Sequence, residues 1–278
     1  MLLRVSASGD RVTTPRPPRV FERFPLVTAV SMAAAGVAAL WVGGRLAGSP
    51  VRYSPADALS YVLPLLVACG CLAVAGVLSA ARPSGRRTGD VVVLGWPVLL
   101  WAAVVAVLGW VGGGPAGETV PVSPGWFLLT VVCTAVFEEF LCRGAIQGVL
   151  VRGLGRPRRA VLLTAAVFAL LHLVGLVGDS AQVLGTLTQV GYTFCLGVYL
   201  GVVRLLGGTL WMPVVLHVVF NALGDVSSLR NGVPTDAPDI PVVTALVLLA
   251  LALPVLLAGL RLLRRVPDGG ERSAQQVS

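Results

Sequence analysis

Long apolar stretches alternate with short segments rich in arginine, proline and glycine along most of the chain. Each stretch is roughly 20 residues long, the length that a helix needs to cross the hydrocarbon core of a bilayer. The pattern predicts eight spans, at residues 25–43, 59–81, 91–112, 126–151, 159–177, 183–206, 209–224 and 241–263. Because no soluble domain fits between them, we expect an all-α fold, a polytopic membrane helix bundle of about eight transmembrane helices.

The composition agrees with a membrane protein. Hydrophobic residues make up 56% of the chain, charged residues only 12%, and the mean hydropathy is +0.86, whereas about a quarter of the residues in soluble domains are charged. All 21 basic residues are arginines. Arginines at the ends of apolar spans determine topology and contact anionic lipid headgroups. The net charge of +8 therefore indicates a membrane-lipid partner rather than nucleic acid.

The arginines also predict the orientation of the spans. If the first span begins in the cytoplasm, three arginines lie outside, Arg45, Arg52 and Arg230. Seventeen lie inside, at positions 4, 11, 16, 19, 23, 82, 86, 87, 152, 156, 158, 159, 204, 261, 264, 265 and 272. Cytoplasmic loops carry the excess of positive charge in membrane proteins. We therefore expect a multi-pass protein with both termini in the cytoplasm.

The two ends of the chain differ in composition from the spans. Residues 1–24 and 266–278 are polar or rich in arginine, proline and serine, so both are expected to be disordered cytoplasmic tails. The integral membrane domain then covers residues 25–265, with the motifs described below inside residues 126–224. A composition rich in Ala, Val and Gly, with arginine as its sole basic residue, is typical of a GC-rich bacterial genome. It indicates the bacterial plasma membrane.

Ionisable residues inside the spans are the candidates for function, because a charge in the hydrocarbon region is costly. The fourth span contains Glu138, Glu139 and Arg143 within six residues. Glu139 and Arg143 are spaced i, i+4, which allows an ion pair on one helix face. Glu138 is rotated by about 100° from Glu139 and has no arginine at i+3 or i+4. It therefore requires a partner from another helix.

Both histidines of the chain are suitable partners for Glu138. His172 ends Phe168-Ala-Leu-Leu-His172 in the fifth span, and His217 precedes Asn221 by one turn in the seventh. At about 1.5 Å per residue, Glu138 and both histidines fall near the middle of a core about 30 Å thick. A carboxylate and a neutral imidazole can deprotonate a water, while a second imidazole and an amide can stabilise an oxyanion. The set favours amide hydrolysis.

The order EExxxR, FxxxH, HxxxN on three membrane helices resembles the CAAX prenyl endopeptidase type II and bacteriocin-processing family of intramembrane proteases, also called CPBP or Abi. The matching positions are Glu138, Glu139, Arg143, Phe168, His172, His217 and Asn221. The resemblance covers roughly residues 126–223. The first three spans and the last one match only as generic membrane helices.

This resemblance implies an intramembrane endopeptidase whose active site lies between helices 4, 5 and 7. Glu138 and His172 would activate water, and His217 and Asn221 would form the oxyanion hole. The supporting residues would be Glu139, Arg143 and Phe168. The expected substrate is a peptide or a membrane protein, and the expected mechanism is of the glutamate type without a cofactor.

Three alternatives remain open from the sequence. A zinc metalloprotease would use Glu138, His172 and His217 as ligands with an open fourth position, although the spacing is not HExxH and no further carboxylate is placed to act as base. A catalytically silent membrane scaffold or immunity protein would keep the same fold. A proton-coupled transporter is less favoured, because it requires ionisable groups along a path to both faces.

Overall fold

The computed structural model describes residues 20–48, 51–77, 88–112, 117–178, 182–235 and 239–267. Within these residues, eight helical segments are long and apolar enough to cross a membrane, which confirms the predicted number of spans. They run over Pro25–Ala47, Pro55–Ala75, Val93–Val111, Pro124–Leu154, Pro157–Val174, Val183–Gly207, Trp211–Asn231 and Val242–Leu263. The seventh span is longer than the sequence indicated, because a second short helix follows the first after a turn.

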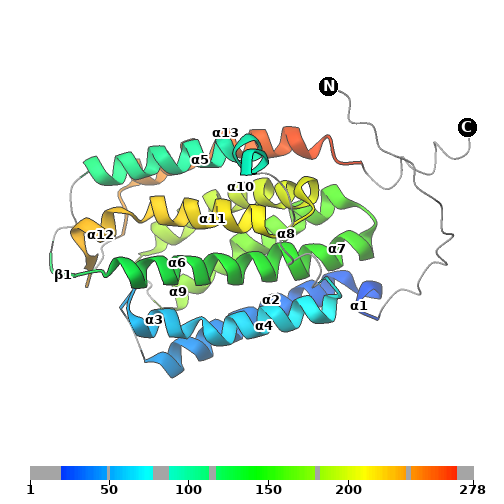
Figure 1. Ribbon diagram of the computed structural model, residues 1–278, viewed down its shortest axis with the longest axis horizontal. Coiled ribbons are helices and arrows are strands. Elements are labelled where there is room, and N and C mark those ends of the chain that lie inside the picture. The colour runs from blue at the N-terminus through cyan, green and yellow to red at the C-terminus, as the bar shows by residue number, and fades with distance from the viewer. Residues whose placement is uncertain are drawn as a thin grey trace, which may run out of the picture.

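The helices lie along one direction and form a single bundle (Figure 1). In chain order they are α1 (Val20–Arg23), α2 (Pro25–Ala47), α3 (Pro55–Ser60), α4 (Val62–Ala75), α5 (Thr88–Val111), α6 (Pro124–Glu139), η2 (Phe140–Ile146), α7 (Gln147–Leu154), α8 (Pro157–Leu171), η3 (His172–Val174), α9 (Gly175–Gly178), α10 (Val183–Gly207), α11 (Trp211–Gly224), α12 (Ser227–Asn231) and α13 (Val242–Leu263). A short antiparallel pair, β1 (Thr119–Val120) and β2 (Val233–Pro234), is the one departure from an all-helical fold in the described chain.

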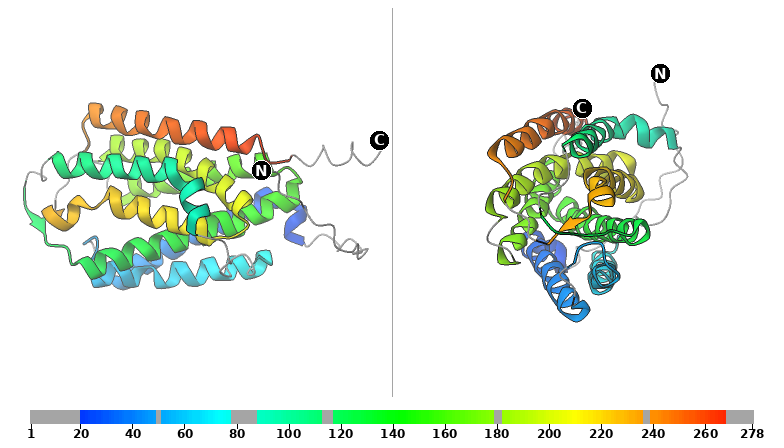
Figure 2. Two further views of the ribbon diagram at one scale, coloured as in Figure 1. Left: turned by 45° about the horizontal axis from the view of Figure 1, so that its top comes forward. Right: turned by 90° about the vertical axis from the view of Figure 1, so that its left-hand side faces the viewer.

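The packing order of the helices differs from their order in the chain. Helix α10 packs between α8 and α13, and α11 packs against both α5 and α6, as the end-on view in Figure 2 shows. Helices α2 and α4 cover the opposite side of α6 and its continuation. Large apolar side chains such as Leu46, Leu66, Val93, Leu246 and Val243 remain exposed on the outside of the bundle. Such a surface is stable in contact with lipid rather than water.

Close contact between α8 and α10 depends on small residues. A Cβ at Gly197 would lie 3.1 Å from Ala165 Cα and 3.3 Å from the Phe168 ring. A Cβ at Gly201 would lie 3.1 Å from both Val161 and the Gln147 side chain. Small residues allow membrane helices to approach closely and gain van der Waals contact. These glycines therefore hold α8, and with it Phe168, against the centre of the bundle.

The fourth span changes its helical geometry in the middle. It is α-helical up to Glu139, π-helical from Phe140 to Ile146, and α-helical again from Gln147. The π turn begins directly after the two glutamates and contains Arg143, which is buried. Such π segments are rare and occur frequently at functional sites. The sequence predicts a regular α-helix throughout this span, so the π turn is a departure from that prediction.

The two ends of the bundle differ in charge. Arg158 donates hydrogen bonds to the carbonyls of Val266 and Arg264 at the end where α8 begins and α13 finishes. At the other end, where β1, α3 and α12 lie (Figure 1), Asp239 accepts hydrogen bonds from the amides of Leu184 and Gly185. Burial raises the pKa of Asp239, but the hydrogen bonds from these two amides and from the Ile240 amide together lower it by more. The pKa of Asp239 is therefore below its ordinary value.

The expected tails fall mostly outside the described residues. Residues 20–23, assigned to the N-terminal tail, instead form α1, whose Phe21 packs against the core. At the other end, Val266 is buried among residues of α8 and α10. The boundaries of the folded part therefore lie a few residues beyond 25–265 on both sides, and residues 1–19 and 268–278 are not described.

Candidate active site

The two glutamates lie at the end of α6 and differ in exposure. The Glu139 side chain is fully buried, whereas 20% of the Glu138 side chain is exposed. A buried carboxylate requires hydrogen-bonding partners or a counter-charge, and Glu139 has both. Glu138 instead faces a cavity, so the two adjacent glutamates occupy different environments.

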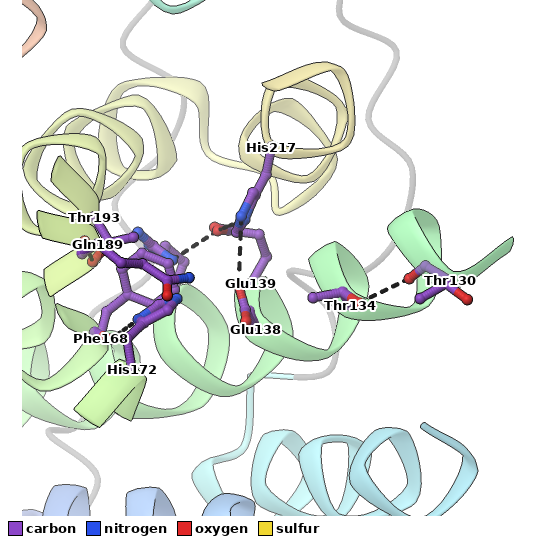
Figure 3. Close-up of polar contacts among 10 residues, drawn as sticks. Thr130, Thr134, Glu138, Glu139, Phe168, His172, Gln189, Thr193 and His217 are labelled. Atoms are coloured by element: carbon purple, nitrogen blue, oxygen red, sulfur yellow. Dashed lines mark hydrogen bonds and ion pairs between the residues drawn. The ribbon is translucent and has the colours of Figure 1, made fainter. Parts of the chain in front are cut away.

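Glu139 connects two motifs through one oxygen. Its Oε1 accepts a hydrogen bond from Arg143 Nη1 at 2.7 Å and lies 2.8 Å from His217 Nδ1 (Figure 3). The Arg143 pair agrees with the spacing in the sequence, but the contact with His217 was not predicted. Because an ionised carboxylate only accepts hydrogen bonds, His217 Nδ1 carries the hydrogen. Glu139 thus sets the tautomer and the orientation of this ring.

Glu138 lies on the other side of the same ring. Its Oε2 is 3.4 Å from His217 Nε2, so the partner from another helix that Glu138 required is His217. With Nδ1 already donating to Glu139, Nε2 carries a hydrogen only when the imidazole is a cation. A hydrogen bond between Glu138 and Nε2 therefore requires a proton on one of the two groups.

His172 lies at the end of α8, where the helix tightens into η3. Its Nδ1 is 2.9 Å from the carbonyl oxygen of Phe168. Because a carbonyl only accepts, Nδ1 is the donor in this contact, and in the neutral ring Nε2 then carries the lone pair. His172 makes no direct hydrogen bond with Glu138 within the described residues, but both side chains line the same two cavities.

The Phe168 ring joins all three motifs. It lies edge-to-face with His172 at 5.1 Å and with His217 at 5.9 Å between ring centroids. The Arg143 guanidinium lies 4.1 Å from its centroid on the ring face. This cation–π contact partly compensates the Arg143 donors Nε and Nη2, which make no hydrogen bond in the described part of the chain. Phe168 therefore fixes the relative positions of the site residues.

Two cavities meet at Glu138 and His172. One, of about 400 Å³, is largely polar and also contains His217, Asn221 and Gln189 in its lining. The other, of about 330 Å³, has an apolar lining that includes Leu40, Phe137 and Leu141 from α2, α6 and η2. A chain bound across both would therefore pass directly by Glu138 and His172.

Asn221 lies one turn after His217 and lines the polar cavity. Its side-chain amide has no hydrogen-bond partner in the described protein, so its donors are available to a ligand. Gln189 on α10 is a further such residue that the sequence analysis missed; it lines both cavities beside Glu138 and His172 (Figure 3). Gln189 is the one side-chain amide within α10, and this is the signal in the sequence that indicates it.

The zinc alternative requires three ligand side chains gathered around one point. No group of three or more His, Cys, Asp or Glu side chains among the described residues is arranged to hold a metal ion. The reaction proposed for this site therefore uses its side chains alone.

Comparison with known families agrees with the motifs. Residues 121–223 match the family described as type II CAAX prenyl endopeptidase Rce1-like. This range contains all seven motif residues and Gln189, and it nearly coincides with residues 126–223, the region of resemblance. The recognition is therefore confirmed. A comparison with curated proteins gave no match.

Proposed function

We propose that this chain, which carries an Rce1-like type II CAAX prenyl endopeptidase domain over residues 121–223, is an intramembrane endopeptidase. The observation that carries the proposal is the meeting of a carboxylate, Glu138, with His172 at the junction of a polar and an apolar cavity. His172 presents the lone pair of Nε2, because its Nδ1 donates to a backbone carbonyl. Glu138 and His172 Nε2 can each accept a hydrogen bond from the same water, and either can remove its proton, which is how a general base activates water.

In the first step, Glu138 and His172 hold one water and remove its proton as the oxygen adds to the carbonyl carbon of the peptide. The proton moves to Glu138 or His172, and the carbonyl oxygen becomes an oxyanion. In the second step the same proton passes to the peptide nitrogen, and the C–N bond breaks. The products are a carboxylic acid and an amine, so no cofactor is consumed.

The oxyanion requires donors that are in place before the reaction. The amide of Asn221 supplies one, since it has no partner in the described protein and lines the polar cavity. The Nε2 of a protonated His217 supplies another, since Glu139 orients the ring through Nδ1 and the ring lines the same cavity. Glu139 and Arg143 act by positioning this ring rather than by touching substrate.

The cavities also define the kind of substrate. The apolar cavity suits the apolar part of a peptide or membrane protein, while the amides of Asn221 and Gln189 in the polar cavity suit its backbone. With the arginine-rich end in the cytoplasm of a bacterial cell, the polar cavity extends from Glu138 towards the non-cytoplasmic face, where Arg52 and Asp225 lie. We therefore propose that the polar part of the substrate enters from that face.

Substrate cleavage and trapping by Glu138→Gln test this function. The substitution keeps the shape and hydrogen bonding of the side chain but removes the base, so cleavage in proteoliposomes should fall by about 10² to 10⁴. Glu118→Gln is the matched control, because Glu118 lies beside β1 and lines none of the cavities described here. A Glu138→Gln variant that keeps the cellular phenotype at normal protein levels would instead identify the chain as a scaffold with the family fold.

A further inference from the structure

Arg52 is the one arginine that lines the polar cavity in the described part of the chain. The connection between α2 and α3 carries it, and it lies on the same cavity wall as Asp225 at the end of α11. No role for this residue follows from the motifs, since it lies far outside the matched region at 121–223. A single cation at the rim of a cavity that leads to Glu138 and His217 is placed to meet an anionic group on a substrate.

The guanidinium is largely available. Its Nη2 donates to Asp225 Oδ2 at 3.0 Å, and 59% of the side chain is exposed. A guanidinium has five N–H donors, and Arg52 makes no other hydrogen bond within the described residues. An arginine side chain stays protonated at physiological pH, so Arg52 is a cation there.

The backbone around Arg52 is held in an unusual conformation. The next residue, Tyr53, has a φ of 61°, which is rare for a residue with a large side chain. The Tyr53 amide donates to Asp57 Oδ2 at 2.7 Å, and its ring packs 4.8 Å from Phe127 and 4.8 Å from the Arg52 guanidinium. These contacts maintain a strained position, and their effect is to fix Arg52 at the cavity rim.

We propose that Arg52 binds a carboxylate of the peptide substrate and so selects carboxylate-bearing peptides. Guanidinium and carboxylate match in geometry and form charge-assisted hydrogen bonds that are stronger than neutral ones. Asp225 competes with the substrate for the same donors and therefore weakens its binding. The carboxylate comes either from the C-terminus of the peptide or from an acidic side chain, and both present the same chemistry. This selectivity rests on the peptidase function proposed above.

Binding to the full-length Glu138→Gln protein in nanodiscs tests the proposal without requiring cleavage. The probes are a dansyl-labelled hexapeptide of alanine and valine with a free carboxyl end, the same peptide with a carboxamide end, and the carboxamide peptide with one aspartate. The free acid or the aspartate peptide should bind more tightly than the plain carboxamide. Whichever of these two binds tightly identifies the source of the carboxylate.

Substitutions of the two paired residues should act in opposite directions. Adding Arg52→Gln should raise the Kd of the carboxylate probe at least about tenfold and leave the carboxamide unchanged, whereas Asp225→Asn should lower the Kd of the carboxylate probe. Arg230→Gln is the control, because Arg230 stacks on Trp110 at the same end of the bundle and lines none of these cavities.

Three results would overturn the role of Arg52. They are equal effects of Arg52→Gln on acid and carboxamide, weaker carboxylate binding in Asp225→Asn, and failure of the parent protein to bind any probe. The first two are what a purely structural ion pair would produce. If the wild-type chain binds carboxylate probes selectively but cleaves none of them, the Arg52 site is supported and the peptidase function is refuted. If it cleaves the acid and the carboxamide equally, the peptidase function is supported and the role of Arg52 is refuted.

Discussion

Glu139 Oε1 lies 2.8 Å from Nδ1 of His217, a residue 78 positions further along the chain. Through this contact the second glutamate of the EE pair orients the histidine that faces the first glutamate. The two adjacent glutamates therefore differ in position. Glu138 borders the cavity, whereas Glu139 is buried and paired with Arg143.

Arg143→Ala should be lost mainly through instability. The substitution leaves the Glu139 carboxylate buried without its counter-charge and removes a cation from the Phe168 ring. Breaking a buried pair in this way costs about 3 to 5 kcal/mol, which denaturant unfolding in detergent would measure. Arg159→Ala is the control, because this side chain is exposed and its loss should change stability by less than about 0.5 kcal/mol. Equal stability of the two variants would contradict a structural role for Arg143.

Asn221→Ala should fold normally and lose activity. Its amide makes no hydrogen bond in the described residues, so no buried partner is left unpaired. If it donates to the oxyanion, turnover should fall by about 10² to 10³, with a smaller effect on KM. Asn231→Ala, at the end of α12, should cleave at the wild-type rate. An active Asn221→Ala enzyme with unchanged kcat would remove Asn221 from the oxyanion hole.

Gly197→Ala should move α8 away from α10. The added Cβ would lie 3.1 Å from the Ala165 backbone, which cannot yield as a flexible side chain can. We expect a destabilisation of about 1 to 3 kcal/mol and a loss of activity, because Phe168 is on the displaced face. Gly70→Ala provides the comparison, since a Cβ there meets nothing within 4 Å. Thermal unfolding of both variants checks this, and an unchanged midpoint for Gly197→Ala would refute the close packing.

The orientation of the bundle can be tested with reporter fusions. We expect both termini and the loops at residues 82–90 and 152–158 in the cytoplasm, and the loop at 113–125 on the other side, because arginine-rich ends remain inside. Reporters active only in the cytoplasm or only outside it, fused after each loop, measure this directly. A non-cytoplasmic location for residues 152–158 would reverse the bundle and place the entrance of the polar cavity in the cytoplasm.

Local properties of the chain were enough to predict the membrane spans. Whether about 20 residues can lie in hydrocarbon depends on those residues alone, and the eight spans expected from apolar runs are the eight helical segments of the structure. The motif residues could also be identified from the sequence, because placing an ionisable side chain in a membrane span costs free energy and such residues are therefore rare there. The resemblance of their order to a known family is likewise a property of the sequence, and the match at 121–223 agrees with it.

The contacts between helices were not accessible in the same way. Hydropathy predicts that a helix lies in the membrane, but it does not predict which helix it packs against or how it is rotated. An apolar side chain is about equally stable against lipid and against another apolar side chain. The π turn after Glu139 sets the direction of Arg143, and the packing of α11 against α6 brings His217 to both glutamates. Arg52 and Asp225, 173 residues apart, meet at the cavity rim for the same reason. Residue type and spacing therefore indicate the candidate residues for the chemistry, whereas close packing between distant helices determines which of them touch.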